Sequence, residues 1–361
     1  VHRKLQALFD DLRKITASNH DKIIIVDDEY LITGGRNVSK NYFVDPRDLK
    51  TVYRDTDILI QSPKVANQAG LAFDEEFRNG GTFQIYKDIF GNADTMSKDL
   101  ELAYNAMRRY ITGGGLFKVP SPTLSKETNE LLKKYNDELK NYERIQHYAS
   151  FRLFNGERAY PTRILDKHSI QGSRNDITKN LSGLMDAAES EIIIQNPYVV
   201  LTEEARAAIK RASDRGVKVI IHTNSPMSSD SLLTQAMFIG DWKGILKDMP
   251  NVRIFGYKLS TKLHSKVFVF DRKIAVIGTY NMDCVSEQIN SEVVAVVKSR
   301  PFANQVAGKI MRDIEDSHEY KIKVERDGSI KTIFGPESHS DKAVIDRLNM
   351  LQKLQWLRPL I

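Results

Sequence analysis

Two stretches of this chain, 244 positions apart, repeat one pattern of charged, glycine and asparagine residues. The first reads "NHDKIIIVDDEYLITGGRN" (residues 19–37) and the second reads "LHSKVFVFDRKIAVIGTYN" (263–281). The shared offset aligns five pairs of residues: His20 with His264, Lys22 with Lys266, Asp27 with Asp271, Gly34 with Gly278, and Asn37 with Asn281. Five pairs at one offset indicate an internal duplication, so the two copies are expected to fold alike.

Around the second copy, apolar runs alternate with amphipathic segments. We expect strands at 191–200, 217–225 and 251–257, and helices at 202–216 and 228–248. Strands that alternate with helices favour parallel pairing through crossover connections. The chain is therefore predicted to be an α/β protein.

The duplication extends beyond the two hairpins. Residues 56–77 and 291–314 each read as a strand followed by a helix that opens with proline, and both helices contain Ala-Asn-Gln, at an offset of 237. A charged helical stretch between the copies, from about 125 to 148, is expected to be a solvated bridge. We divide the chain into four regions: a first lobe at 1–94, a linker with the charged helix at 95–160, a second lobe at 161–320, and a C-terminal extension at 321–361.

The first copy is shorter at its beginning than the second. In the second copy 73 positions separate Glu191 from His264, whereas 19 residues precede His20, which leaves a deficit of at least 54 residues. A half-sheet without its central strands exposes long unpaired edges. We therefore expect a further N-terminal segment of the same protein to act as a partner and to supply those strands.

Composition narrows the class of protein. The 53 lysine and arginine residues exceed the 47 aspartate and glutamate residues by six, a charge that is compatible with an anionic partner and equally with an ordinary, mildly basic surface. The single cysteine, Cys284, excludes an internal disulfide. No apolar run approaches the roughly 20 residues that span a bilayer, so we expect a globular chain without a spanning helix.

The repeated His-x-Lys pattern places reactive groups on one face of a strand. Residues two apart in a strand point to the same side, so His20 projects with Lys22, and His264 projects with Lys266. A single strand histidine is more often a core residue, but two sets in register indicate a shared site. The asparagine that closes each hairpin adds an amide donor.

Other repeated residues are expected to shape the hairpins. Asp27 and Asp271 fall at the turns, where an aspartate orders the backbone through local hydrogen bonds. Gly34 and Gly278 end the second strands and allow a sharp change of direction.

Two histidines, two lysines and two asparagines around a pseudo-twofold axis fit a phosphodiester. The cations and amides can stabilise the non-bridging oxygens, one histidine can attack phosphorus, and the other can protonate the leaving alcohol, with no metal or cofactor required. Each histidine also needs a carboxylate to orient it. Asp57 and Glu292, just before the strands that follow the hairpins, are the candidates, although both could instead be surface charges at a strand end.

The doubled pattern resembles the HKD motifs of the phospholipase D superfamily, and the run from Asn290 to Glu292 matches that family's downstream N-x-E element. The resemblance covers roughly residues 15–95 and 160–320. It implies a two-lobed fold of mixed sheets flanked by helices, with a pseudo-twofold repeat and an active site between the lobes. It also implies metal-free chemistry through a phosphohistidine, with His20 as the nucleophile and His264 as the general acid and base.

Within this superfamily, three stretches resemble the bacterial cardiolipin synthase-like branch: "GGRNVSKNYF" (34–43), "IIIQNPYVV" (192–200) and "RGVKVIIHTNSPMSSD" (215–230). Arg36, Asn196 and Tyr198 lie in these stretches and are candidate substrate-binding residues. The resemblance implies a phospholipid substrate and a peripheral position at a bacterial inner membrane or its periplasmic face. A nuclease or another phosphodiesterase of the superfamily is the alternative, and a catalytically inactive membrane-binding scaffold is a third; a nucleic-acid partner is disfavoured.

The C-terminal stretch 342–361 has a broad apolar face, a tryptophan and a net charge of +3. Such a cationic amphipathic helix suits an anionic membrane surface. A terminal helix docked on the core of the protein has the same pattern, so both interpretations stay open.

Overall fold

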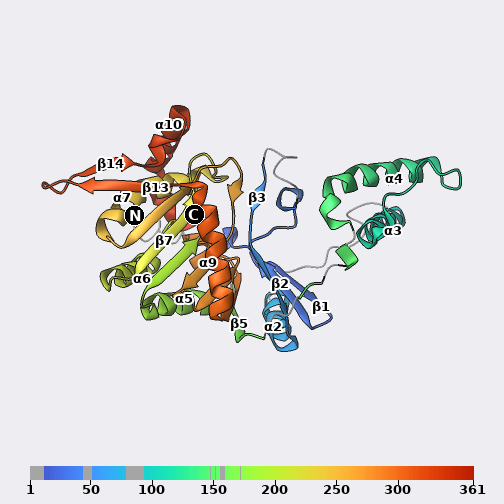
Figure 1. The fold of residues 1–361 in the computed structure, drawn as a ribbon, viewed down its shortest axis with the longest axis horizontal. Helices are drawn as coiled ribbons and strands as arrows, with labels where there is room; N and C mark the ends of the chain where they lie inside the picture. Colours follow the sequence, from blue (N-terminus) through green and yellow to red (C-terminus); the bar gives the residue numbers. More distant parts are fainter. Residues whose placement is uncertain are drawn as a thin grey trace. The chain divides into compact units, whose positions relative to one another are not determined.

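The computed structural model describes residues 12–43, 51–78, 93–146, 148–150, 152–154, 159–170 and 172–361 (Figure 1). The chain forms two compact units. One unit contains both hairpins and Tyr160–Ile361, and the other contains Arg78–Ala159. The residues that the sequence singled out for chemistry all belong to the first unit. The boundaries predicted near 94, 160 and 320 stay predictions.

The first unit is built around a mixed sheet of nine strands. The central strands β6, β7 and β8 are parallel, and the remaining neighbours pair antiparallel. In sheet order the strands are β14 (Ile330–Phe334), β13 (Ser317–Val324), β8 (Val252–Tyr257), β7 (Lys218–Asn224), β6 (Glu191–Gln195), β10 (Val267–Phe270), β11 (Ile274–Gly278), β12 (Glu292–Lys298) and β5 (Thr162–Lys167). The predicted α/β class is confirmed.

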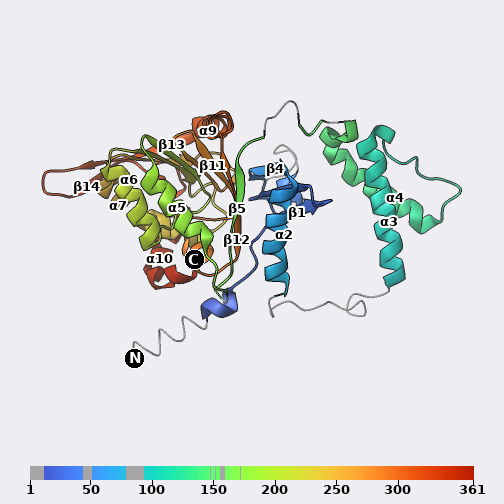
Figure 2. The same cartoon turned by 90° about the horizontal axis from the view of Figure 1, so that it is seen from below.

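Helices cover both faces of this sheet because its strands are apolar on both sides. Ile192 and Ile194 face one core, whereas Ile193 between them faces the other. Helices pack on the two faces as Figures 1 and 2 show, with α5 (Asp176–Ala187), α6 (Glu203–Asp214) and α7 (Leu232–Asp248) on the first face and α9 (Arg300–Glu315) on the second. The hydroxyl of Thr202 accepts from the backbone N–H of Ala205 and caps α6.

The first copy of the repeat forms a smaller sheet of three strands followed by a helix. Its elements are β1 (Ile23–Val26), β2 (Tyr30–Gly34), β4 (Asp57–Gln61) and α2 (Pro63–Arg78). The register of its hairpin pairs Ile23 with Thr33, and the second hairpin pairs Val267 with Ile277, each 244 positions later. The turns repeat as well: the two residues at each tip have positive φ, at 27–28 and at 271–272. The duplication is therefore structural, down to the backbone of the turns.

The strand β1 lies at an edge of the three-stranded sheet. Its counterpart β10 instead pairs on that side with β6, through Val267 opposite Gln195. An upstream segment that pairs with β1 in the same way stays a prediction.

The structure of the second unit contradicts the expectation that the charged stretch from about 125 to 148 forms a solvated bridge. It contains α3 (Ala93–Arg109) and α4 (Lys126–Leu139), and the two helices bury a small apolar core that includes Ala106 and Leu132. Helix α4 starts at Ser125, whose hydroxyl accepts from the backbone of Thr128. The charged stretch is thus one face of a packed helix, which its high charge concealed in the sequence.

The C-terminal stretch docks on the core, as one of its two interpretations expects. Helix α10 (Lys342–Leu351) buries Ile345 and Leu348 against Ala236 and Ile239 of α7. A 3₁₀ segment (Gln352–Leu360) follows and leaves Trp356 exposed. Across the described ranges, we find no helix that combines the length and the apolar character needed to cross a membrane.

Gly278 is required by close packing between β11 and β12. A Cβ atom at this position would lie 2.3 Å from the carbonyl oxygen of Val293 and 2.6 Å from the Cα of Val294. We expect Gly278→Ala to lower the free energy of unfolding by about 1–3 kcal/mol, since backbone atoms must shift. In the control Gly183→Ala, on α5, nothing lies within 4 Å of the new Cβ, and stability should rise by about 0.5–1 kcal/mol. Denaturant unfolding measures both; equal effects would contradict this account.

Candidate functional site

A short two-stranded ladder brings a carboxylate to the second histidine. β3 (Tyr53–Arg54) pairs in parallel with β9 (Lys262–Leu263), and the backbone N–H of His264 donates to the carbonyl of Arg54 (2.8 Å). The residues that follow the two strands, Asp55 and His264, therefore lie side by side. Nδ1 of His264 is 2.7 Å from Oδ2 of Asp55.

The first histidine meets its carboxylate through an equivalent contact. Asn19 forms a parallel bridge with Ser291, and the backbone N–H of Ser291 donates to the carbonyl of Ser18 (3.2 Å). The next residues along the chain, His20 and Glu292, lie together, with Nδ1 of His20 at 2.9 and 3.0 Å from the two oxygens of Glu292. Each histidine is thus paired with the carboxylate of the other copy. This crossed arrangement ties the two halves of the repeat into one site.

Glu292 is fully buried and fixed by hydroxyl groups. Thr279 and Ser286 both donate to its oxygens, and the hydroxyl of Ser286 also accepts from the backbone of Asn281 (3.1 Å). A carboxylate held in this way cannot rotate away from His20, so it fixes the ring and leaves Nε2 directed elsewhere. Sequence reasoning missed Thr279 and Ser286 as supports of Glu292.

Asp57, predicted to orient a histidine, does not contact His264. It begins β4 opposite Gly34, and its carboxylate accepts from Nε (2.5 Å) and from the backbone N–H (3.2 Å) of Arg36. The orienting role falls to Asp55. The signal was in the sequence: the 237-residue offset of the strand and helix after each hairpin, applied to Glu292, leads to Asp55.

Both lysines lie against the carboxylates of both pairs. Lys22 interacts electrostatically with Glu292 and Asp55, and Lys266 interacts with the same two groups. Nζ of Lys22 donates to the carbonyl of His20 (2.8 Å), and Nζ of Lys266 donates to that of His264 (2.5 Å). Burial lowers the pKa of Lys266 to about 8 and also lowers the pKa of Lys22.

The surroundings of His264 shift its pKa downward. Burial lowers its pKa, and the charge of Lys266 acts in the same direction, with Nζ 2.8 Å from Nδ1 and 3.1 Å from Nε2. Asp55 opposes both effects and favours the protonated ring. The pKa of His264 is therefore set by a balance that a bound anion would tip towards the imidazolium.

The two asparagines are placed differently. Nδ2 of Asn37 donates to the hydroxyl of Tyr42 (3.1 Å), which lies 3.4 Å from Nδ1 of His264. Oδ1 of Asn281 is buried and accepts no hydrogen bond from the part of the chain that the structure describes. Asn37 thus reaches the site through Tyr42, while the position of Asn281 follows from its backbone bond to Ser286.

Three tyrosine rings stand edge-on around His264. The ring centroids of Tyr42, Tyr53 and Tyr198 lie 5.3, 5.5 and 6.4 Å from that of His264. The hydroxyl of Tyr198 donates to Oδ1 of Asp230 (2.8 Å). Tyr198 therefore borders the site, and its role in binding substrate stays a prediction. Tyr42 and Asp230 lie in stretches quoted for the resemblance but were not singled out, and Tyr53 lies outside those stretches.

Two of the predicted substrate-binding residues form hydrogen bonds within the fold. Asn196 is buried; its amide donates to the carbonyl of Tyr280 (3.2 Å) and accepts from the backbone of Met282 (3.1 Å). Arg36 binds Asp57 and donates to the carbonyl of Tyr42 (2.5 Å). Their polar atoms stabilise the loops around the site, and a substrate-binding role for either residue stays a prediction.

The repeated aspartates adopt the left-handed backbone that these hairpin turns need, with φ of 54° at Asp27 and 49° at Asp271. The carboxylate of Asp271 does not bond within its turn, as expected, but accepts from the backbone N–H groups of Glu189, Ser190 and Glu191. Burial alone would raise the pKa of Asp271, but these hydrogen bonds lower it to about 2. Asp271 therefore fastens the hairpin to the start of β6.

Comparison with known proteins identifies relatives of this chain. A family model described as "Cardiolipin synthase, PLD-like domain" matches residues 181–314. The chain is 25% identical over 314 residues to an uncharacterized protein of Helicobacter pylori strain J99, covering 82% of this chain and 57% of that protein. It is 24% identical over 315 residues to cardiolipin synthase 1 of Bacillus anthracis, covering 87% of this chain and 49% of that protein. The chain thus spans about half the length of these curated relatives.

A solved structure shares the fold. The phosphatidylserine synthase of Haemophilus influenzae Rd KW20 matches with a TM-score of 0.57 at 10% sequence identity, covering 96% of this chain and 72% of that one. At this identity the likeness concerns the fold alone. It supports the mixed α/β architecture expected from the sequence.

Proposed function

Because this chain belongs to the phospholipase D superfamily, in its cardiolipin synthase-like branch, we propose that it transfers or hydrolyses phosphodiesters of phospholipids through a phosphohistidine. The crossed histidine–carboxylate pairs carry this proposal. Nδ1 of each ring faces a carboxylate, at 2.9 Å for His20 and 2.7 Å for His264, so Nε2 of each ring is the nitrogen left for chemistry.

In the first step Nε2 of His20 attacks phosphorus. The P–N bond forms as the bond between phosphorus and the leaving alcohol oxygen breaks, and His264 in its imidazolium form gives its proton to that oxygen. The anionic phosphodiester itself favours this form, because its charge offsets that of Lys266 on His264. The products are a phosphohistidine at His20, a neutral ring at His264 and a free alcohol.

In the second step an incoming alcohol or water gives its proton to the neutral His264. The resulting nucleophile attacks phosphorus, the P–N bond breaks, and His20 is restored. The ammonium groups of Lys22 and Lys266 stabilise the non-bridging oxygens in both steps. No step requires a metal ion or an organic cofactor.

For the substrate, the cardiolipin synthase-like branch favours phosphatidylglycerol. One molecule would give its phosphatidyl group to His20 and release glycerol, and a second would accept the group through its free hydroxyl. A phospholipid donor requires contact with an anionic bilayer surface, so we also propose a peripheral membrane position, at the inner membrane or its periplasmic face.

The test is mass spectrometry of the lipids formed from phosphatidylglycerol vesicles, with and without isotopically labelled glycerol. Transfer gives cardiolipin, hydrolysis gives phosphatidic acid, and labelled glycerol returns to phosphatidylglycerol through the phosphoenzyme. His20→Ala is the inactive control. Cleavage of an oligonucleotide without any change in the lipids would contradict the phospholipid assignment and favour a nuclease.

The alkaline limb of the pH profile tests the role of Lys266. Because burial lowers the pKa of Lys266 to about 8, its charge is present below that pH and is lost above it. We expect kcat/KM for a p-nitrophenyl phosphodiester, whose leaving group needs no proton from His264, to fall as pH rises through about 8 in a scan from about pH 6 to 10. Lys266→Arg, which stays charged, should move this limb upward even if its maximum rate is lower. If the alkaline fall in kcat/KM stays at the same pH in Lys266→Arg, another group causes it.

A further inference from the structure

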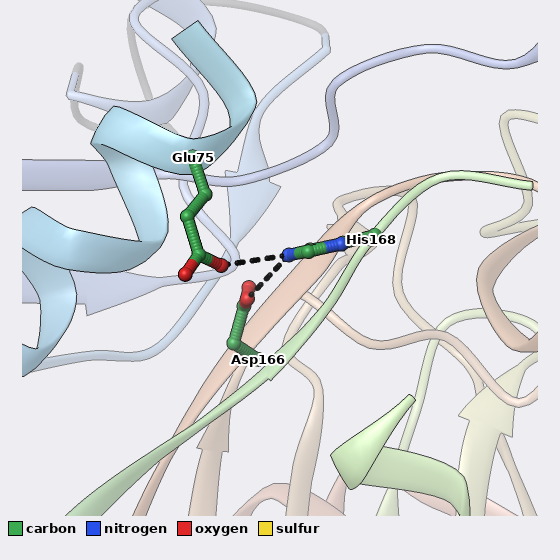
Figure 3. A group of neighbouring side chains, drawn as sticks. All are labelled: Glu75, Asp166 and His168. Carbon is green, nitrogen blue, oxygen red and sulfur yellow. Dashed lines mark hydrogen bonds and ion pairs between the residues drawn. The ribbon is translucent and has the colours of Figure 1, made fainter. Parts of the chain in front are cut away.

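Three side chains of the types that bind metals lie close together, away from His20 and His264. Glu75 comes from α2, Asp166 from β5, and His168 from the residues just after β5 (Figure 3). Nε2 of His168 lies 3.0 Å from Oε2 of Glu75 and 3.5 Å from Oδ2 of Asp166. One ligand atom from each residue lies within 4.8 Å of the others. These side chains converge on one point from both copies of the repeat.

Asp166 has ion-pair neighbours in His168 and Arg174 but is not satisfied by hydrogen bonds. It is 1% exposed, and within the described ranges neither of its carboxylate oxygens accepts a hydrogen bond. In the same part of the described chain, both oxygens of Asp21 and Oε1 of Glu76, on half-buried residues, also accept no hydrogen bond. Burial and the neighbouring carboxylates, Asp166 and Glu76 among them, raise the pKa of Asp21 to about 8. Buried carboxylates are normally paired, hydrogen-bonded or bound to a metal. A cation bound at Asp166 would satisfy oxygens that Arg174 approaches only at 3.7 Å.

His168 is fixed in place for this role. Its backbone N–H donates to the carbonyl of Arg174 (2.9 Å), which closes the loop between them. A Cβ atom at Gly172 would lie 2.3 Å from Cβ and 2.7 Å from Nδ1 of His168, so the loop packs directly on the side chain. The imidazole is therefore held in position before any ligand arrives, as metal sites require.

We propose that Glu75, Asp166 and His168 bind a divalent transition-metal cation that fastens α2 to β5. An imidazole with two carboxylates suits Zn²⁺ or Mn²⁺, whereas Ca²⁺ and Mg²⁺ prefer oxygen ligands alone. The cation is structural, because the reaction proposed for His20 and His264 does not use it. This inference is thus independent of the proposed function.

Arg174 gives the proposal its sharpest test. One of its terminal nitrogens lies 3.6 Å from Glu75 and 3.7 Å from Asp166, at the same oxygens that approach His168. Its Nε donates to Asp176 (2.8 Å). Arg174 thus competes with a metal for the two carboxylates and has a second partner when displaced. Its removal should strengthen metal binding, whereas it should weaken a cluster that is only a set of ion pairs.

The experiment uses the full chain freed of metal by a chelator and titrated with Zn²⁺ or Mn²⁺ alone. Calorimetry should show one site, and the melting temperature should rise with metal concentration. Asp166→Asn and His168→Gln should each weaken affinity at least about tenfold, and Arg174→Gln should strengthen it by about tenfold. The matched control is Asp248→Asn, which removes a carboxylate paired with Arg206 on another face and should leave binding unchanged.

The outcomes separate clearly. Absence of binding to the wild-type chain would overturn the proposal and leave Glu75, Asp166, His168 and Arg174 as an ion-pair cluster. Binding that persists in both Asp166→Asn and His168→Gln would place the metal elsewhere and would overturn it as well. Lipid products need not be measured, so failure here leaves the phosphodiester chemistry untouched.

Discussion

We expect the His20→Ala variant to form no phosphoenzyme, whereas His264→Ala should still form one slowly on His20. Both should lose steady-state turnover of phospholipid by about 10⁴-fold or more, because each ring acts in every cycle. The difference arises from the leaving group. An activated leaving group needs no proton, so the first step can proceed without His264, while the second step lacks its base and the intermediate accumulates.

The measurement is trapping of the intermediate by acid-free quenching and peptide mass spectrometry, with a p-nitrophenyl phosphodiester as donor. His318→Gln, on β13, is the control for loss of a histidine outside the site and should keep full turnover. Phosphate found on His264 in the His20→Ala variant would reverse the two roles. Phosphate on neither ring in the wild-type chain would contradict the covalent mechanism itself.

We could predict those features of the structure that depend on local sequence alone. The shared offset anticipated the hairpin register, and the aspartates at 27 and 271 occupy the left-handed turn positions of both copies. His-x-Lys spacing placed the reactive groups on one strand face because strand periodicity is fixed by geometry. These features need no information about what the strand packs against.

Features set by tertiary contact were missed. Asn196 and Arg36 were singled out as candidate substrate-binding residues from the stretches that contain them, and the sequence did not show that the fold uses their hydrogen-bonding atoms internally. The rings of Tyr42 and Tyr53 lie edge-on to His264, and their positions in the sequence do not predict these contacts. Asp57 was chosen for its position before a strand, although pairing across strands, not position along one, decides which carboxylate meets a histidine.

The second prediction with a large expected effect concerns which carboxylate of the first copy, Asp55 or Asp57, orients His264. We expect Asp55→Asn to lower kcat for phospholipid by about 10²–10⁴-fold. An amide at this position can donate to Nδ1 of His264 and so favour the wrong tautomer. It also removes the charge that raises the pKa of His264, so less of the ring carries the proton that the leaving alcohol requires.

Asp57→Asn is the matched variant, with the same chemical change two residues away. It weakens a partly exposed pair with Arg36, so we expect reduced thermal stability and a change in kcat of less than about tenfold.

The leaving group separates positioning of His264 from general damage to the fold. With a p-nitrophenyl donor the first step needs no acid, so the Asp55→Asn defect in phosphoenzyme formation should shrink by about tenfold or more, whereas any Asp57→Asn defect should be the same for both donors. If Asp57→Asn shows the leaving-group dependence and Asp55→Asn does not, the original assignment from the sequence is right and the pairing of Asp55 with His264 has no catalytic role.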